Sequence, residues 1–159
     1  MALSTISKIL IPIDGSESSM RAADAAIELA RRYAKDSQPV EIIALHVIDI
    51  NPTFRLFSKY GFHYSEYEKK AREVAQKSTE EWFSKIKKKA DRHNLRFRSK
   101  VTDNSSATII RKIERFAKKE RVDLIVIGTR GQSEFERLLL GSVTSGVSVY
   151  ASCSVMIVK

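Results

Sequence analysis

Short runs of valine, isoleucine and leucine alternate along this chain with segments of helical periodicity, and this alternation constrains the fold more than any other feature. Most of the runs are almost wholly apolar, which is typical of strands buried on both faces of a sheet. Strands separated by helices form parallel sheets, because each helix returns the chain to the starting edge. The sequence therefore predicts a five-stranded parallel α/β sheet, doubly wound, with strands at 8–14, 40–48, 95–101, 122–127 and 155–158.

The segments between these runs show the spacing of helices that bury one face. Ser16 or Ser18 can cap the first helix, and the sequence Ser-Glu-Tyr-Glu at 65–68 fits a capping box before the second. A third helix is expected from Ile109 and a fourth from about Ser142. The buried face of the second helix is predicted to contain Ala71, Val74, Ala75, Ser78, Trp82, Ile86 and Ala90.

A length of 159 residues suits a single domain over 1–159 with its own core. No apolar run approaches the roughly 20 residues of a membrane span, and residues 1–7 lack the layout of a signal peptide, so we expect a cytoplasmic protein without membrane contact. The single cysteine, Cys153, is expected to be a small buried apolar residue. The three histidines lack ligand spacing, which predicts no metal site.

Ligands of doubly wound sheets bind at the carboxyl ends of the strands, where the winding direction reverses. This rule brings together Asp14 after the first strand, residues 47–49 after the second, and Gly128 after the fourth. The same edge also receives the glycine-containing segment 128–141. The sequence thus places its candidate site at one edge of the sheet.

The segment Gly128-x-x-Gly131, nine further residues and then Gly141-Ser142 joins a buried strand to a helix. We expect Gly128 to let a ligand approach the backbone, because a side chain there would intervene. The first N–H groups of a helix have no partner within it and favour anions. The hydroxyls of Ser142 and Thr144 would add donors. The segment therefore predicts a phosphate-binding cradle.

These residues resemble the ATP-binding motif of the universal stress protein family, and KILIPIDGS, ALHVID, VDLIVIGTRG and LLLGSVT resemble that family in order and spacing. The resemblance implies a Rossmann-like fold with strand order 3-2-1-4-5. It also implies that Asp14 accepts a ribose hydroxyl and that Val47 packs on adenine. The implied site contains Pro12, Ile13, Asp14, Val47, Ile127, Gly128, Arg130, Gly131, Gly141, Ser142, Val143 and Thr144.

The function implied by the resemblance is that of a stress-response regulatory protein which binds ATP, ADP or AMP, with any Mg²⁺ carried by the phosphates. Hydrolysis is expected to be slow at most. The apolar strand 155–158 would lie at the edge of the sheet, so we expect a homodimer through it. Gly146 stands where the family more often has a larger residue, at an expected cost to its helix of about 0.5–1 kcal/mol.

Two other functions stay open from the sequence. An adenylating or phosphotransfer enzyme of related fold would need cations near the phosphates, for which only Arg130 and Arg137 qualify. A nucleic-acid-binding module could use residues 85–121, where fourteen Lys and Arg against four Asp and Glu give a net charge of +10. Few aromatic residues interleave with these charges, which favours a solvated face.

The aromatic segment 49–64 is interpreted as a lid over the ligand or against a dimer partner.

Overall fold

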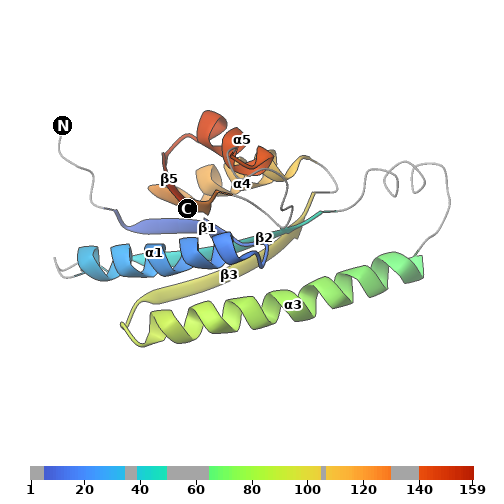
Figure 1. The fold of residues 1–159 in the computed structure, drawn as a ribbon, viewed down its shortest axis with the longest axis horizontal. Coiled ribbons are helices and arrows are strands. Elements are labelled where there is room, and N and C mark those ends of the chain that lie inside the picture. Colours follow the sequence, from blue (N-terminus) through green and yellow to red (C-terminus); the bar gives the residue numbers. More distant parts are fainter. Residues whose placement is uncertain (1–5, 35–38, 50–64, 105–106, 130–139) are drawn as a thin grey trace.

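The computed structural model describes residues 6–34, 39–49, 65–104, 107–129 and 140–159, and the aromatic segment interpreted as a lid lies almost wholly outside them. Five strands of the described chain form one parallel sheet in the order β3-β2-β1-β4-β5 (Figure 1). Both the count and the order confirm the prediction. The strands are β1 (Lys8–Pro12), β2 (Glu41–Ile48), β3 (Arg96–Asp103), β4 (Leu124–Gly128) and β5 (Ser154–Val158).

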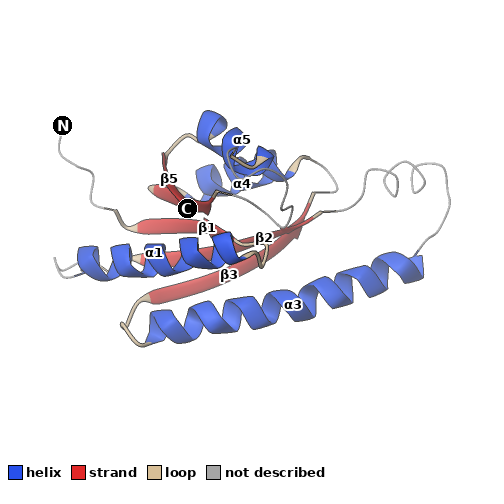
Figure 2. Ribbon diagram, in the orientation of Figure 1, coloured by secondary structure: helices blue, strands red, loops and turns tan. Residues whose placement is uncertain are grey.

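Four described helices cover the two faces of this sheet (Figure 2). They are α1 (Glu17–Tyr33), α3 (Ser65–Asp91), α4 (Ile109–Glu120) and α5 (Ser142–Tyr150). Neighbouring side chains of β1 pack on opposite faces of the sheet. Ile9 lies in the core beneath α1 and α3, and Leu10 lies in the core beneath α4 and α5. The sheet is therefore buried on both sides, as its nearly continuous apolar strands require.

Side-chain caps fix where two of the helices begin. Ser16 accepts the backbone N–H of Ser19 at 3.1 Å, which confirms one of the two predicted caps of α1. Thr108 accepts the N–H of Arg111 at 3.3 Å at the start of α4. Each bond satisfies a donor that the first turn of a helix cannot satisfy itself. The side chains of the capping box predicted at 65–68 lie outside the described residues.

The predicted buried face of α3 is correct only toward its end. Ile86 and Ala90 are fully buried, but Val74 is 67% exposed, so that part of the prediction is wrong. Figure 1 shows why: the first turns of α3 run past the carboxyl ends of the strands and have no sheet beneath them. Thr79 and Phe83, absent from the predicted face, are buried instead, and the Thr79 hydroxyl donates to the carbonyl of Ala75 at 2.6 Å. The side chain of Ala71 is not among those described.

Asp123 fastens the start of β1 to the start of β4. One of its carboxylate oxygens accepts three hydrogen bonds, from the N–H and hydroxyl of Ser7 at 2.9 and 2.8 Å and from the N–H of Lys8 at 2.9 Å. Burial raises the pKa of this carboxyl group, but the donors of Ser7 and Lys8 outweigh burial and hold the pKa below its ordinary value. The charged form is thus the one that the fold stabilises.

Replacing Asp123 with alanine should lower the free energy of unfolding by about 1.5–3 kcal/mol, the range for a hydrogen bond to a charged group. Because the folded-state pKa is lowered, this contribution is present above the unfolded-state pKa and is lost as the pH falls through the folded-state value. Urea denaturation at neutral pH and well below the ordinary aspartate pKa of about 3.9 would measure both effects. Equal stability of the two proteins at neutral pH would contradict the assignment.

Burial raises the pKa of the Cys153 thiol, and the negative charge of Asp123 acts in the same direction. The half-buried Cys153 thus stays protonated, which agrees with its interpretation as a small apolar residue. No helix in the described part of the chain is both long and apolar enough to cross a membrane.

Candidate functional site

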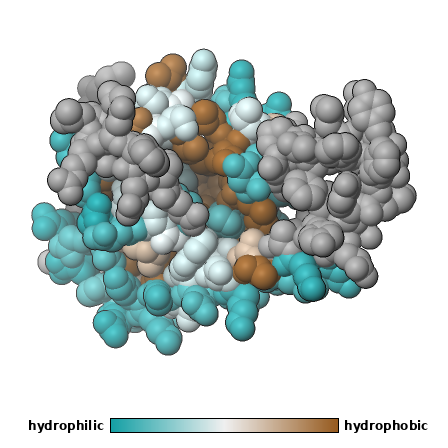
Figure 3. Space-filling model, turned by 45° about the vertical axis from the view of Figure 1, so that its right-hand side comes forward, coloured by the Kyte–Doolittle hydropathy of each residue, from teal (hydrophilic) through white to brown (hydrophobic). Residues whose placement is uncertain are grey.

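A cavity of about 310 Å³ lies at the carboxyl edge of the sheet, between the ends of β1, β2 and β4 and the first turns of α4 and α5. Figure 3 brings this edge forward and shows a hollow in which hydrophobic side chains gather. Ten of the twelve predicted site residues line the cavity: Pro12, Ile13, Asp14, Val47, Ile127, Gly128, Gly141, Ser142, Val143 and Thr144. The other two, Arg130 and Gly131, lie outside the described residues, as does Arg137.

Five lining residues are absent from the implied site, although the winding rule already placed Asp49 at this edge: Ser19, Leu45, Asp49, Ile109 and Ile113. Three of them follow from simple periodicity. Leu45 is two residues before Val47 and points to the same side of β2. Ile109 and Ile113 stand four residues apart on one face of α4. Knowing that α4 covers this side of the sheet would have been enough to identify them.

One wall of the cavity is apolar. Leu45, Val47, Ile113 and Ile127 belong to the core layer beneath α4 and α5, and each is at most 8% exposed. These side chains are held by core packing on their far sides, so the wall is already formed without a ligand. A flat apolar ring is the kind of group that such a wall accepts.

The opposite part of the cavity is formed by the start of α5. Gly141 is the N-cap residue and, having no side chain, leaves the first turn without a side-chain cap. Its own N–H donates to the carbonyl of Thr129 at 2.8 Å, so the donors that remain belong to the residues after it. Ser142, Val143 and Thr144 all line the cavity. Backbone N–H groups at a helix start favour an anionic group.

Two interpretations of single residues need correction. The hydroxyl of Thr144, expected to serve a ligand, donates instead to the carbonyl of Gly128 at 2.7 Å and fastens α5 to β4. A Cβ atom on Gly128 would lie 2.4 Å from the hydroxyl oxygen of Ser18 and 2.6 Å from its carbonyl carbon. Glycine is therefore required there by the close approach of α1, and the prediction that a ligand requires it is corrected.

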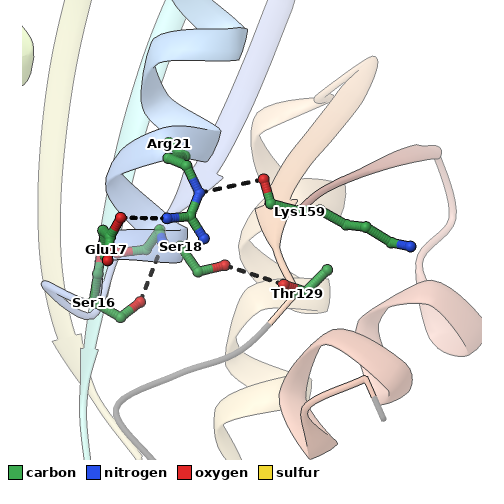
Figure 4. Close-up of polar contacts among 7 residues, drawn as sticks. Ser16, Glu17, Ser18, Arg21, Thr129 and Lys159 are labelled. Carbon is green, nitrogen blue, oxygen red and sulfur yellow. Dashed lines mark hydrogen bonds and ion pairs between the residues drawn. The ribbon is translucent and has the colours of Figure 1, made fainter. Parts of the chain in front are cut away.

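Hydrogen bonds join the start of α1 to Thr129, directly after β4, and to the end of the chain. Thr129 donates its N–H to the carbonyl of Val158 at 3.0 Å, and its hydroxyl oxygen lies 3.4 Å from that of Ser18 (Figure 4). Arg21 of α1 contacts Glu17 at 2.7 Å and the carbonyl of Lys159 at 3.2 Å in the same view. The start of α1 is thus fixed against the ends of β4 and β5.

Asp14 has a structural role in addition to its place in the cavity wall. One oxygen of its carboxylate accepts the N–H and the hydroxyl of Ser16, at 3.0 and 2.6 Å. These bonds shape the turn that leads into α1. The position of Asp14 beside the cavity fits the role that the resemblance implies, and contact with a ribose hydroxyl stays a prediction.

The ionisable side chains that line the described part of the cavity are Asp14 and Asp49. The amide of the buried Asn104 donates to Asp49 at 2.5 Å and so orients its carboxylate. No lysine or arginine lines this described part of the cavity. A phosphate bound there would therefore depend on the backbone N–H groups at the start of α5 and on residues outside the described part of the chain. The described residues contain no group of three or more His, Cys, Asp and Glu suited to a metal ion.

His46 of β2 is half-buried, and its ring contacts the backbone of Ile13, which lines the cavity. Its Nδ1 lies 2.7 Å from the carbonyl oxygen of Ile13 and must carry a proton, because a carbonyl can only accept. The ring also meets Trp82 edge-on, with centroids 5.4 Å apart. Trp82 in turn packs over Gly15, whose φ of +80° suits glycine.

The sheet order and the position of the cavity define a Rossmann-like α/β domain with a cavity at its topological switch point. The chain belongs to the universal stress protein family, whose model matches residues 5–159.

Similar proteins agree with this assignment. A universal stress protein of Methanocaldococcus jannaschii is 33% identical over 152 residues, which cover 96% of this chain and 81% of that protein. The universal stress protein YxiE of Bacillus subtilis is 31% identical, with 96% and 98% covered. Among solved structures, UspA of Lactobacillus plantarum superposes with a TM-score of 0.73 at 21% identity, covering 98% of this chain and 99% of that one.

Proposed function

We propose that this chain binds an adenine nucleotide in the cavity at the carboxyl edge and acts as a stress-response regulatory protein, with ATP hydrolysis slow at most. The observation that carries the proposal is a single cavity with an apolar wall on one side and an uncapped helix start on the other. A nucleotide has the matching halves, a flat base and an anionic phosphate chain. The proposed base site is formed by Val47, Ile113 and Ile127, and the proposed phosphate site by the first residues of α5.

Solved structures of the same fold support the choice of ligand. One universal stress protein is described in complex with cAMP, one of Arabidopsis thaliana with AMP bound, and one of Archaeoglobus fulgidus in complex with dAMP. At 17–19% identity and TM-scores of 0.64–0.67 these proteins share the fold with this chain. The fold is therefore able to hold an adenine nucleotide.

The remaining roles rest on the sequence motif. Asp14 would accept a ribose hydroxyl, and Arg130 and Gly131 would complete the phosphate site from the segment that follows β4. The described lining offers Asp14 and Asp49 as its carboxylates, and one oxygen of each already accepts a hydrogen bond. A Mg²⁺ ion would therefore be held chiefly by the phosphates of ATP.

Nucleotide released from the purified, heat-denatured chain should be identified by mass spectrometry, and calorimetry on the emptied protein should compare ATP, ADP and AMP. We expect saturable binding of at least one of them. A steady-state assay should find phosphate release slower than about 1 s⁻¹, the lower end of ordinary enzyme turnover. Absence of binding by all three nucleotides would reject the proposal, and faster turnover would favour the phosphotransfer enzyme.

The proposed dimer rests on an apolar surface at the β5 edge of the sheet. Within the described sheet, β5 pairs only with β4, so its other edge is unpaired. Met156 and Ile157 are 40% and 36% exposed, and the nearby α5 exposes Val149 and Tyr150 at 72% and 57%. An exposed apolar strand edge favours pairing with another copy of the chain.

Replacing Met156 and Ile157 with lysine should therefore convert the dimer to a monomer, because two buried charges per chain would face their copies across a two-fold axis. Val155 and Val158 are unsuitable for this test, since both pack against the core. Light scattering at micromolar concentration measures the mass. A monomeric unmodified chain, or an unchanged dimer in the double variant, would exclude this strand as the contact.

A further inference from the structure

Six of the fourteen basic residues of segment 85–121 lie at or just after the ends of α3 and α4 and at the start of β3, at the edge of the sheet opposite the cavity. Helices in this fold end at the amino edge, and α3 and α4 each carry two lysines in the last turn. Figure 1 shows α3 ending where β3 begins. We call the surface formed there by the following exposed residues the basic edge: Lys88, Arg92, Arg96, Lys118, Lys119 and Arg121.

Hydrogen bonds join the three elements that contribute to the basic edge. The turn from α3 to β3 is tight, because the N–H groups of His93 and Leu95 both donate to the carbonyl of Ala90, at 3.0 and 3.1 Å. Arg98 of β3 donates to the carboxylate of Glu120 at the end of α4, at 2.7 Å. The end of α3, the start of β3 and the end of α4 are thus held at the same edge, and the six cations lie on these segments.

In the part of the chain that the structure describes, the acidic side chains close to the basic edge each contact a cation outside it. Glu41 and Glu120 both contact Arg98, Asp91 contacts Lys87, and Asp24 contacts Lys89. No cation of the basic edge makes a side-chain hydrogen bond or an ion pair with another described residue. Among the described residues this surface thus presents six positive charges without an ion pair, of which Lys119 is partly offset by the neighbouring Glu120. The net charge of the chain outside residues 85–121 is −1.

The helix dipole accounts for only part of this charge. A cation in the last turn of a helix contributes about 0.3–1 kcal/mol by facing the free carbonyl groups, which explains the lysines of α3 and α4. Arg96 is the first residue of a strand, and six like charges on one edge repel one another. An anionic partner would remove that repulsion.

We infer that the basic edge binds duplex nucleic acid through its phosphates. The cations are distributed over two helix layers and the sheet between them. Neighbouring layers lie about 10 Å apart, so the cations span about 20 Å, the length of about six base pairs. Near the basic edge, Tyr33 at the end of α1 is an exposed aromatic side chain of the described chain, which is too little for the successive stacking contacts that single strands require. Large apolar side chains are exposed mainly elsewhere in the described chain, Tyr33 of α1 apart, which argues against insertion into a membrane.

The test compares two variants of the full chain with equal charge changes. The basic-edge variant carries glutamine in place of Lys88, Arg92 and Lys118. The control variant carries glutamine in place of Lys69, Lys70 and Lys77. The second set is exposed and lies in the first half of α3, away from the basic edge. Binding of a duplex of about 20 base pairs is titrated between about 50 and about 200 mM salt, beside a single strand of the same sequence and phosphatidylserine vesicles.

The unmodified chain should bind the duplex more tightly than the single strand or the vesicles, with affinity falling steeply as salt rises. Each phosphate contact makes the plot of log affinity against log salt steeper by about 0.9. Removing three cations should therefore reduce the steepness by about 2.7 and the affinity by at least about ten-fold. The control variant should keep its slope. Equal weakening of both variants, tighter binding to vesicles, or no duplex binding at the lowest salt would each overturn the inference.

Discussion

Replacing Ile109 with tryptophan should reduce adenine-nucleotide affinity by at least about 100-fold, the largest effect that we expect from any single substitution at the cavity. Ile109 is the first residue of α4, is half-buried and lines the apolar side of the cavity. An indole ring there would occupy much of a cavity of about 310 Å³ that the nucleotide itself must fill. Calorimetry with ATP, ADP and AMP measures the loss.

The control for this substitution is Val74→Trp. Val74 is 67% exposed on the part of α3 that extends past the strands, so the same ring added there should leave both the fold and nucleotide binding unchanged. Thermal unfolding of both variants distinguishes a blocked cavity from a damaged core. Unchanged affinity in a folded Ile109→Trp protein would place the nucleotide elsewhere and would reject the proposed base site.

Much of this site was predictable because strand periodicity and the rule for doubly wound sheets fix which residues meet. Asp14 follows β1, Val47 lies near the end of β2 and Gly128 ends β4, yet parallel pairing brings the carboxyl ends of these strands to one edge. The start of α5 at Ser142 was equally predictable, since Gly141 interrupts the apolar pattern before it. These predictions needed only the order of elements along the chain.

The remaining features depend on packing between distant elements, which no local pattern encodes. The apolar wall from Ile109 and Ile113 depends on which face of the sheet α4 covers. The exposure of Val74 depends on how far α3 extends beyond the strands. The partner of the Thr144 hydroxyl depends on the distance from α5 to β4, and only the three-dimensional arrangement shows that this hydroxyl reaches Gly128.

Gly146 is another residue whose role depends on packing that the local sequence does not show. Its sequence position within a helix predicted a cost relative to a larger residue. In the structure, a Cβ atom there would lie 2.3 Å from the Cδ1 atom of Ile110, so the glycine allows α5 to approach α4 closely. The helix gives up some intrinsic stability, and the contact between the two helices compensates for it.

Replacing Gly128 or Gly146 with alanine adds one methyl group in each case. The two variants should differ in stability, because the new group meets backbone atoms at Gly128 and a side chain that can move at Gly146. At Gly128 the new Cβ would lie 2.6 and 2.7 Å from the backbone C and O atoms of Ser18, so either α1 or β4 must shift. We expect Gly128→Ala to lower the free energy of unfolding by about 1–3 kcal/mol, the usual cost of overpacking. The melting temperature should fall by about 2–4 °C for each kcal/mol.

At Gly146 the nearest atoms belong to the side chain of Ile110, which is half-buried and can change its rotamer. The cost of that movement is offset by the gain of about 1 kcal/mol when alanine replaces glycine inside a helix. Gly146→Ala should therefore change the free energy of unfolding by less than about 1 kcal/mol in either direction. Urea denaturation of the two variants gives both values, and a Gly128→Ala protein as stable as the unmodified chain would show that α1 and β4 are not in rigid contact at the base of the site.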